Sequence, residues 1–255
     1  MTAPTGVPAP NRSAIVDLDA LRHNIAVLMA RSAGGPLVLD VTADAYGHGL
    51  LPVATVAAEA GVDILSLRDE ADARRIADAG ITIDVHAWHS RRAAMPPAGS
   101  GIAAFGYGMQ VTDGDPEGLV PVMTLTAPVS SVKRVGEGHG VSYGFVYRTS
   151  TESTLALVPL GYADGIPRVA TGSARMALGG VQHPVVGRIA MDQVVLDVGD
   201  SPVSLGDTVT VFGPGLAGEP SAADWAGIAG TTPGEILARI GQRVPRHYID
   251  SRGAW

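Results

Sequence analysis

The chain has 255 residues, of which 46% are hydrophobic, and it contains 33 glycines and 18 prolines. This composition is typical of a globular protein with one large domain or two small ones. The net charge of -7 argues against nucleic acid or an anionic membrane as a partner, because both attract basic surfaces. The absence of cysteine excludes disulfides, thiolate metal sites and a cysteine nucleophile.

The N-terminal segment is rich in proline and reads M-T-A-P-T-G-V-P-A-P-N-R. It lacks a basic start followed by an apolar run, and no stretch of the chain approaches the roughly 20 apolar residues of a membrane span. We therefore expect a flexible tail over residues 1–12 and a cytoplasmic protein with no membrane partner.

The first half of the chain alternates strands with helices. After a short strand at residues 14–17, Leu18, Leu21, Ile25 and Leu28 recur at helical spacing, and Asp17 or Asp19 can cap this helix. Further strands are predicted at residues 37–41, 62–67, 81–87 and 101–105, and further helices at 51–60 and 69–79. Strands that alternate with helices, each helix ended by glycine, indicate βαβ units and a parallel sheet.

The second half has a different texture, with short alternating strands separated by Gly and Pro turns. Strands are predicted at residues 119–126, 129–135, 154–160, 184–189, 194–198 and 207–212, and helices at 222–228 and 232–240. We place the boundary between the halves near residues 110–118. The expected domains are a partial β/α domain over residues 13–115 and a mainly antiparallel β domain over residues 116–255.

Several motifs occur in one order along the chain: V-T-A-D-A-Y-G-H-G at residues 41–49, G-I-A-A-F-G-Y at 101–107, V-S-Y-G at 141–144, G-Y-A-D-G-I-P-R at 161–168, G-R-I-A-M-D-Q at 187–193 and R-V-P-R at 243–246. In this order the set resembles the alanine racemase family. The resemblance implies a TIM-type β/α barrel followed by a β domain, with pyridoxal phosphate as cofactor.

The resemblance also assigns roles to residues. Tyr162 matches the tyrosine that the family uses as its second base and lends to a partner subunit. Met191 and Asp192 match substrate-binding positions that are also lent across the dimer. Tyr46, Gly101 and Ile102 match positions that contact the cofactor phosphate, which backbone amides and a hydroxyl can hold.

The sequence also departs from the family at three cofactor positions. Thr42 stands where the Schiff-base lysine belongs, and Lys133 is the only lysine of the chain. Gly99 replaces the arginine beside the pyridine nitrogen, and Gly234 replaces a tyrosine that binds phosphate. Since a threonine hydroxyl cannot form a Schiff base, covalent binding of pyridoxal phosphate is not expected, and non-covalent binding is left open.

A complete barrel needs roughly 250 residues, and fewer than half that number precede the β domain. The family comparison places four missing βα units between about His89 and Gly101. The surviving strands would form a half-barrel in the order 101–105, 37–41, 62–67, 81–87, with two open edges. Open edges favour association, so we expect a homo- or hetero-oligomer formed through these edges and the C-terminal domain.

Purely structural interpretations, without a functional role, remain open for these motifs. The segment around Tyr46 and His48 is equally compatible with an ordinary strand-to-helix loop in which His48 is solvated, and Tyr162 with a buried aromatic residue in a turn. His86 and His89 lie at a strand end, where alternating faces disfavour a shared metal, so no metal site is expected.

The sequence as a whole predicts a degenerate alanine racemase homologue without racemase activity, which binds or helps to assemble a complete racemase. An active racemase that holds its cofactor non-covalently, and a chain without function, are the alternatives.

Overall fold

The computed structural model describes residues 12–32, 34–88, 101–107 and 118–253. The structure divides into two compact units, and the chain passes from one to the other within its first and fifth strands, β1 (Ser13–Asp17) and β5 (Met123–Pro128). The predicted tail, the linker at residues 91–100 and most of the predicted domain boundary lie outside the described residues. No helix of the described segments is both long enough and apolar enough to cross a bilayer.

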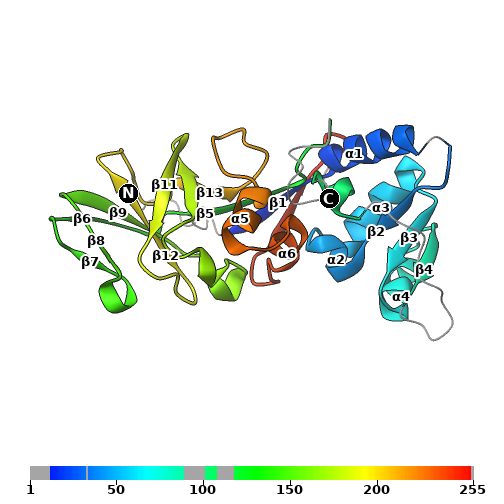
Figure 1. The fold of residues 1–255 in the computed structure, drawn as a ribbon. Helices are drawn as coiled ribbons and strands as arrows, with labels where there is room; N and C mark the ends of the chain where they lie inside the picture. The colour runs from blue at the N-terminus through cyan, green and yellow to red at the C-terminus, as the bar shows by residue number, and fades with distance from the viewer. Residues whose placement is uncertain (1–11, 33, 89–100, 108–117, 254–255) are drawn as a thin grey trace, which may run out of the picture. The chain divides into compact units, whose positions relative to one another are not determined.

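The α/β unit is built mostly from residues 15–123. It contains α1 (Leu18–Arg31), β2 (Val38–Asp40), α2 (Thr42–Tyr46), α3 (Leu50–Ala60), β3 (Ile64–Leu67), α4 (Glu70–Asp78), β4 (Asp84–Ala87) and the 3-10 helix η1 (Gly101–Phe105). Two later segments complete it, α6 (Pro233–Ala238) and β14 (Arg246–Ile249). In Figure 1 the helices α1, α3 and α4 follow one another along this unit, each in contact with the next.

The capping signals of the sequence explain where these helices begin and end. Asp17 caps α1, because its Oδ1 accepts hydrogen bonds from the backbone N–H groups of Asp19 and Ala20, both at 2.9 Å. Asp69 caps α4 in the same way. Gly61 ends α3 with a φ of 82°, a conformation that glycine adopts without steric cost.

Three strands of this unit form a parallel sheet in the order β2-β3-β4. This confirms the predicted order of the strands at residues 37–41, 62–67 and 81–87. The sheet is a partial barrel, and the buried side chains of Leu39, Leu65 and Leu67 belong to its core.

The prediction of a strand at residues 101–105 is wrong, because Gly101–Phe105 forms the 3-10 helix η1. The buried side chain of Asn24 supplies the physical reason. Its Nδ2 donates to the carbonyl oxygens of Ala104 at 3.0 Å and Val120 at 2.7 Å, and its Oδ1 accepts from the N–H of Val120 at 2.8 Å. One carbonyl of η1, that of Ala104, is therefore hydrogen-bonded to a side chain of α1, where a ladder with β2 was expected.

The β unit contains the antiparallel strands that the sequence predicts. Seven antiparallel strands follow the order β5-β13-β10-β11-β12-β9-β6. Six of them were predicted, and β10 (Arg175–Leu178) was missed. The elements after β5 are β6 (Ser131–Val135), β7 (Gly140–Val141), η2 (Tyr143–Phe145), β8 (Tyr147–Arg148), β9 (Ser153–Val158), η3 (Tyr162–Asp164), η4 (Arg168–Ala170), β10 (Arg175–Leu178), β11 (Val181–Val186), β12 (Val194–Gly199), β13 (Thr208–Phe212) and α5 (Ala222–Ala229). Strands β7 and β8 form a separate hairpin, and Trp225 of α5 is buried with its Nε1 donating to the Val211 carbonyl at 2.8 Å.

Candidate functional site

The segment after β2 is a left-handed turn. Ala43, Asp44, Ala45 and Tyr46 all have φ between 51° and 56°, although none of them is glycine. Such a conformation costs roughly 1–2 kcal/mol per residue, so neighbouring groups must hold it. The Asp44 carboxylate accepts from the N–H of Leu50 at 2.8 Å, and Arg246 Nε donates to the Gly47 carbonyl at 2.9 Å. The turn carries Thr42 at its start and Tyr46 at its end.

Tyr46 points back toward the strand that precedes it. Its hydroxyl donates to Oδ2 of Asp40 at 2.9 Å, and Oδ1 of Asp40 accepts from the N–H of Thr42 at 3.0 Å. Burial raises the pKa of Tyr46, and the nearby Asp40 carboxylate raises it further. The phenol is therefore a protonated donor whose hydrogen is directed at Asp40.

The structure brings together three of the positions expected at the cofactor phosphate. A Cβ on Gly234 of α6 would lie 3.1 Å from both Ile102 Cδ1 and Tyr46 Cε1. The Tyr46 ring thus covers the Gly234 backbone, and the ring also lies 5.4 Å from that of Phe105. Ile102, Tyr46 and Gly234 form one neighbourhood, Gly101 precedes Ile102 in the chain, and Gly99 lies outside the described residues.

His48 is a core residue, so the interpretation that it is solvated is wrong. It is fully buried, stacks on Phe105 with ring centroids 4.4 Å apart, and its Nδ1 lies 2.9 Å from the Ala45 carbonyl. Burial lowers the pKa of His48 to about 4. A neutral imidazole in this position packs the left-handed turn against η1.

The β unit holds the other predicted site residues, beginning with Tyr162 in the turn η3. Tyr162 is 43% exposed, which contradicts its interpretation as a buried aromatic residue. The turn beneath it is closed by Asp164, a fully buried carboxylate whose Oδ2 accepts from the N–H of Gly161 at 2.9 Å. A Cβ on Gly161 would lie 2.2 Å from the Met191 carbonyl oxygen, so only glycine allows the two loops to approach this closely.

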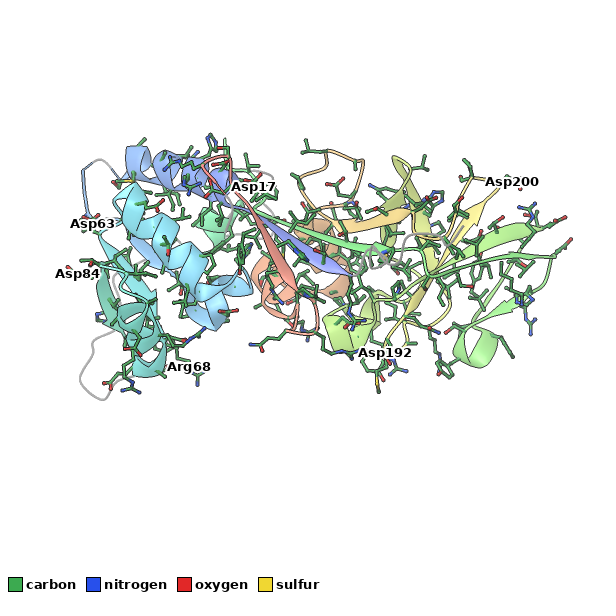
Figure 2. The ribbon with its side chains drawn as sticks, turned by 180° about the vertical axis from the view of Figure 1, so that it is seen from behind. Asp17, Asp63, Arg68, Asp84, Asp192 and Asp200 are labelled. Carbon is green, nitrogen blue, oxygen red and sulfur yellow. The ribbon has the colours of Figure 1, made fainter. Side chains whose placement is uncertain are left out.

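Met191 and Asp192 lie beside this turn and are both exposed; Figure 2 labels Asp192. The N–H of Tyr162 donates to the Ala190 carbonyl and that of Ala163 to the Met191 carbonyl, both at 3.0 Å. Arg243 joins the loops through their side chains, because its Nη2 donates to Asp192 at 2.6 Å while its Nε lies 3.4 Å from Asp164. Tyr162, Met191 and Asp192 therefore form one surface group, defined here as the donor group.

Two family models match the chain: the alanine racemase N-terminal domain over residues 16–107 and the alanine racemase C-terminal domain over residues 122–248. The chain belongs to the alanine racemase family. Its alanine racemase relatives include that of Frankia casuarinae, 51% identical over 58% of this chain and 39% of the relative. That of Beutenbergia cavernae is 41% identical over 77% of this chain and 55% of the relative.

Solved structures agree with this assignment. The alanine racemase of D-cycloserine-producing Streptomyces lavendulae superimposes with a TM-score of 0.88 at 28% identity, over 96% of this chain and 98% of that one. The alanine racemase of Streptomyces coelicolor gives a TM-score of 0.82 at 30% identity, over 94% and 98% of the two chains. The chain spans about two fifths of the length of the first curated relatives that it matches.

Alanine racemases depend on pyridoxal phosphate, and the neighbourhood of Tyr46 does not fit that cofactor. The Thr42 hydroxyl cannot form a Schiff base, and the Tyr46 ring covers the backbone of Gly234. The Tyr46 hydroxyl donates to a carboxylate, Asp40, whose negative charge repels phosphate. Among the described residues, no three His, Asp or Glu side chains gather as a metal-binding group.

Sequence reasoning missed two residues that organise these sites, Asp40 and Arg243, and it missed the contacts of a third, Asp164. Asp40 ends an apolar strand, and a carboxylate in that position was the available signal. Asp164 and Arg243 lie within motifs that the sequence displays, G-Y-A-D-G and R-V-P-R, but they are 79 positions apart. Only the folded chain shows that they contact each other.

Proposed function

We propose that this chain does not racemise alanine by itself and that it docks on a complete alanine racemase, to which it lends the donor group. The observation that carries the proposal is the contrast between two sets of residues. Thr42 and Gly234 have lost the chemistry that serves a cofactor in the same subunit. The donor group keeps the residue types that the family lends to a partner, and it presents them on the surface.

The geometry of the donor group supports this function because contacts within the chain hold its backbone and Asp192 in place. The Tyr162 turn is closed through Asp164, and Arg243 connects Asp164 to Asp192. Preorganised groups of this kind lose little conformational entropy when they complete a site. In the mixed dimer, Tyr162 would act as a proton-transfer group on a substrate held by the complete subunit.

Co-expression with the full-length racemase of the same host tests the proposal. The two chains should co-purify through a tag on either one, and Tyr162→Phe in this chain should lower the activity of the mixed dimer without dissociating it. Tyr143→Phe is the matched control, because Tyr143 is a more exposed tyrosine of the same unit. If the chains elute separately at micromolar concentrations, the docking proposal is wrong.

Family membership favours a second candidate function, alanine racemisation with pyridoxal phosphate held non-covalently. The supporting observation is the 51% identity to a known alanine racemase. Formation of D-alanine from L-alanine by the purified chain, in excess cofactor and in the absence of any other racemase, distinguishes this candidate from the first.

A further inference from the structure

The carboxyl edge of the β2-β3-β4 sheet carries a row of polar side chains. The register pairs Asp40 with Ser66, and Ser66 with His86. Residues paired in a parallel sheet project from the same face, so these three lie side by side across the strands. The carboxyl ends of parallel strands are where open α/β sheets bind their ligands.

Asp40 is the acidic residue of this row. It contacts Tyr46, one of the positions expected at the cofactor phosphate. Its two oxygens accept hydrogen bonds from the Thr42 N–H and the Tyr46 hydroxyl, and these hold the carboxylate in place. Neither donor carries a positive charge, so the negative charge of Asp40 is not neutralised by them. Asp40 is only partly exposed, and water screens charges less well in such surroundings.

Tyr46 does not offer its hydroxyl to an anion. Its hydroxyl hydrogen is already directed at Asp40, 2.9 Å away, and a phosphate oxygen would have to compete with a carboxylate for it. The Tyr46 ring also fills the space over Gly234. Tyr46 lies at the end of the left-handed turn, with a φ of 51°, and its hydroxyl reaches Asp40 at the end of β2.

We infer that the Asp40 carboxylate selects ligands at this edge of the sheet by their charge. It excludes ligands that carry a phosphate and admits neutral or cationic polar groups. Asp40 acts here as a specificity-determining residue. The inference concerns the α/β unit alone, so it stands or fails independently of the docking of the donor group.

The test compares pyridoxal phosphate with pyridoxal, which lacks the phosphate. Thr42→Lys supplies an amine, so that either compound can be trapped by borohydride reduction and the occupied fraction read from the intact mass. The ratio of the half-saturating concentration of pyridoxal to that of pyridoxal phosphate defines the phosphate preference. Adding Asp40→Asn should shift this preference toward pyridoxal phosphate by about tenfold, or about 1.4 kcal/mol, with little change in the binding of pyridoxal.

Two further variants in the Thr42→Lys background serve as controls. Asp84→Asn removes the same charge from an exposed position on β4, labelled in Figure 2, and should change the preference by about twofold at most. Tyr46→Phe removes the hydroxyl but keeps the Asp40 charge, so it should not increase the phosphate preference.

Asp40→Asn retains an oxygen that can accept from Thr42 and Tyr46, so the variant should fold, which circular dichroism checks. An unchanged phosphate preference in Asp40→Asn overturns the inference, and so does an equal shift in Asp84→Asn. Failure of the Thr42→Lys, Asp40→Asn double variant to take up pyridoxal phosphate also overturns it, because removing the charge would then not have opened the edge.

Discussion

The hydroxyl of Tyr248 lies so close to Gly49 that a Cβ at residue 49 would be 2.1 Å from it. Gly49 has a φ of 99° and directly precedes α3, while Tyr248 belongs to β14. The late strand β14 therefore packs against the end of the left-handed turn. A Cβ at residue 49 would force the Tyr248 side chain to shift, and the φ of 99° would strain any other residue there, so the contact and the conformation both favour glycine.

Gly49→Ala should lower the free energy of unfolding by roughly 2–3 kcal/mol, because it adds both a steric clash and positive-φ strain. Gly61→Ala is the control, since Gly61 has a φ of 82° but its nearest neighbour, Met29 Cε, is 3.8 Å from the added Cβ. Gly61→Ala should lower the free energy of unfolding by only about 1 kcal/mol. Urea unfolding of both variants measures the difference, and equal losses would show that the Tyr248 contact is unimportant.

The stability of the protein should fall as pH drops from about 6.5 to about 4. Burial lowers the pKa of His48 to about 4, whereas in the unfolded chain it is about 6.5. The unfolded state therefore takes up a proton first, and the loss approaches about 1.4 kcal/mol per pH unit within this window. Unfolding curves at a series of pH values measure the slope.

His48→Gln isolates this contribution, because it removes the titrating ring. In His48→Gln the free energy of unfolding should fall less steeply as pH drops than in the unaltered protein. Some dependence on pH should remain, since burial also lowers the pKa of His183. The lowered pKa values of Asp19 and Asp197 act at a lower pH, as their ordinary value is 3.8. Identical slopes in His48→Gln and the unaltered protein would contradict the assignment.

Asp164→Asn should destabilise the protein by about 1–2 kcal/mol. The variant keeps an oxygen to accept from Gly161 but leaves Arg12 and Arg243, at 3.5 and 3.4 Å, without their buried counter-charge. The full effect of breaking a buried pair is larger, but both arginines are partly exposed and solvent screens them. Thermal unfolding measures the loss; Asp200→Asn, which removes an exposed carboxylate, is the control.

The purified chain should not convert L-alanine to D-alanine, even with excess pyridoxal phosphate. Thr42 cannot form the Schiff base, and Asp40 repels the cofactor phosphate. A chirality assay measures the outcome. Turnover that disappears in Tyr162→Phe would contradict this prediction and would identify the chain as an active racemase.

Local sequence determined much of the fold. The spacing of Leu18, Leu21 and Ile25 and the Asp17 cap were sufficient to place α1, because helical periodicity and capping depend on residues a few positions apart. The same holds for the three parallel strands and for six of the antiparallel strands, whereas β7, β8 and β10 were not predicted. The strand expected at residues 101–105 was wrong, and the contacts of that segment come from distant residues: the side chain of Asn24, 80 positions away, donates to the Ala104 carbonyl.

For the candidate site too, some properties follow from the sequence and others only from the tertiary structure. The residue types alone establish that the Thr42 hydroxyl cannot act as a Schiff-base amine. That Tyr162, Met191 and Asp192 match the family positions stays a prediction from the resemblance. Only the tertiary structure decided that Tyr46 donates to Asp40, that His48 is buried, and that Arg243 links Asp164 to Asp192. The physical reason is that chemical identity belongs to a single residue, whereas burial and hydrogen-bond partners depend on residues that folding brings together from distant parts of the chain.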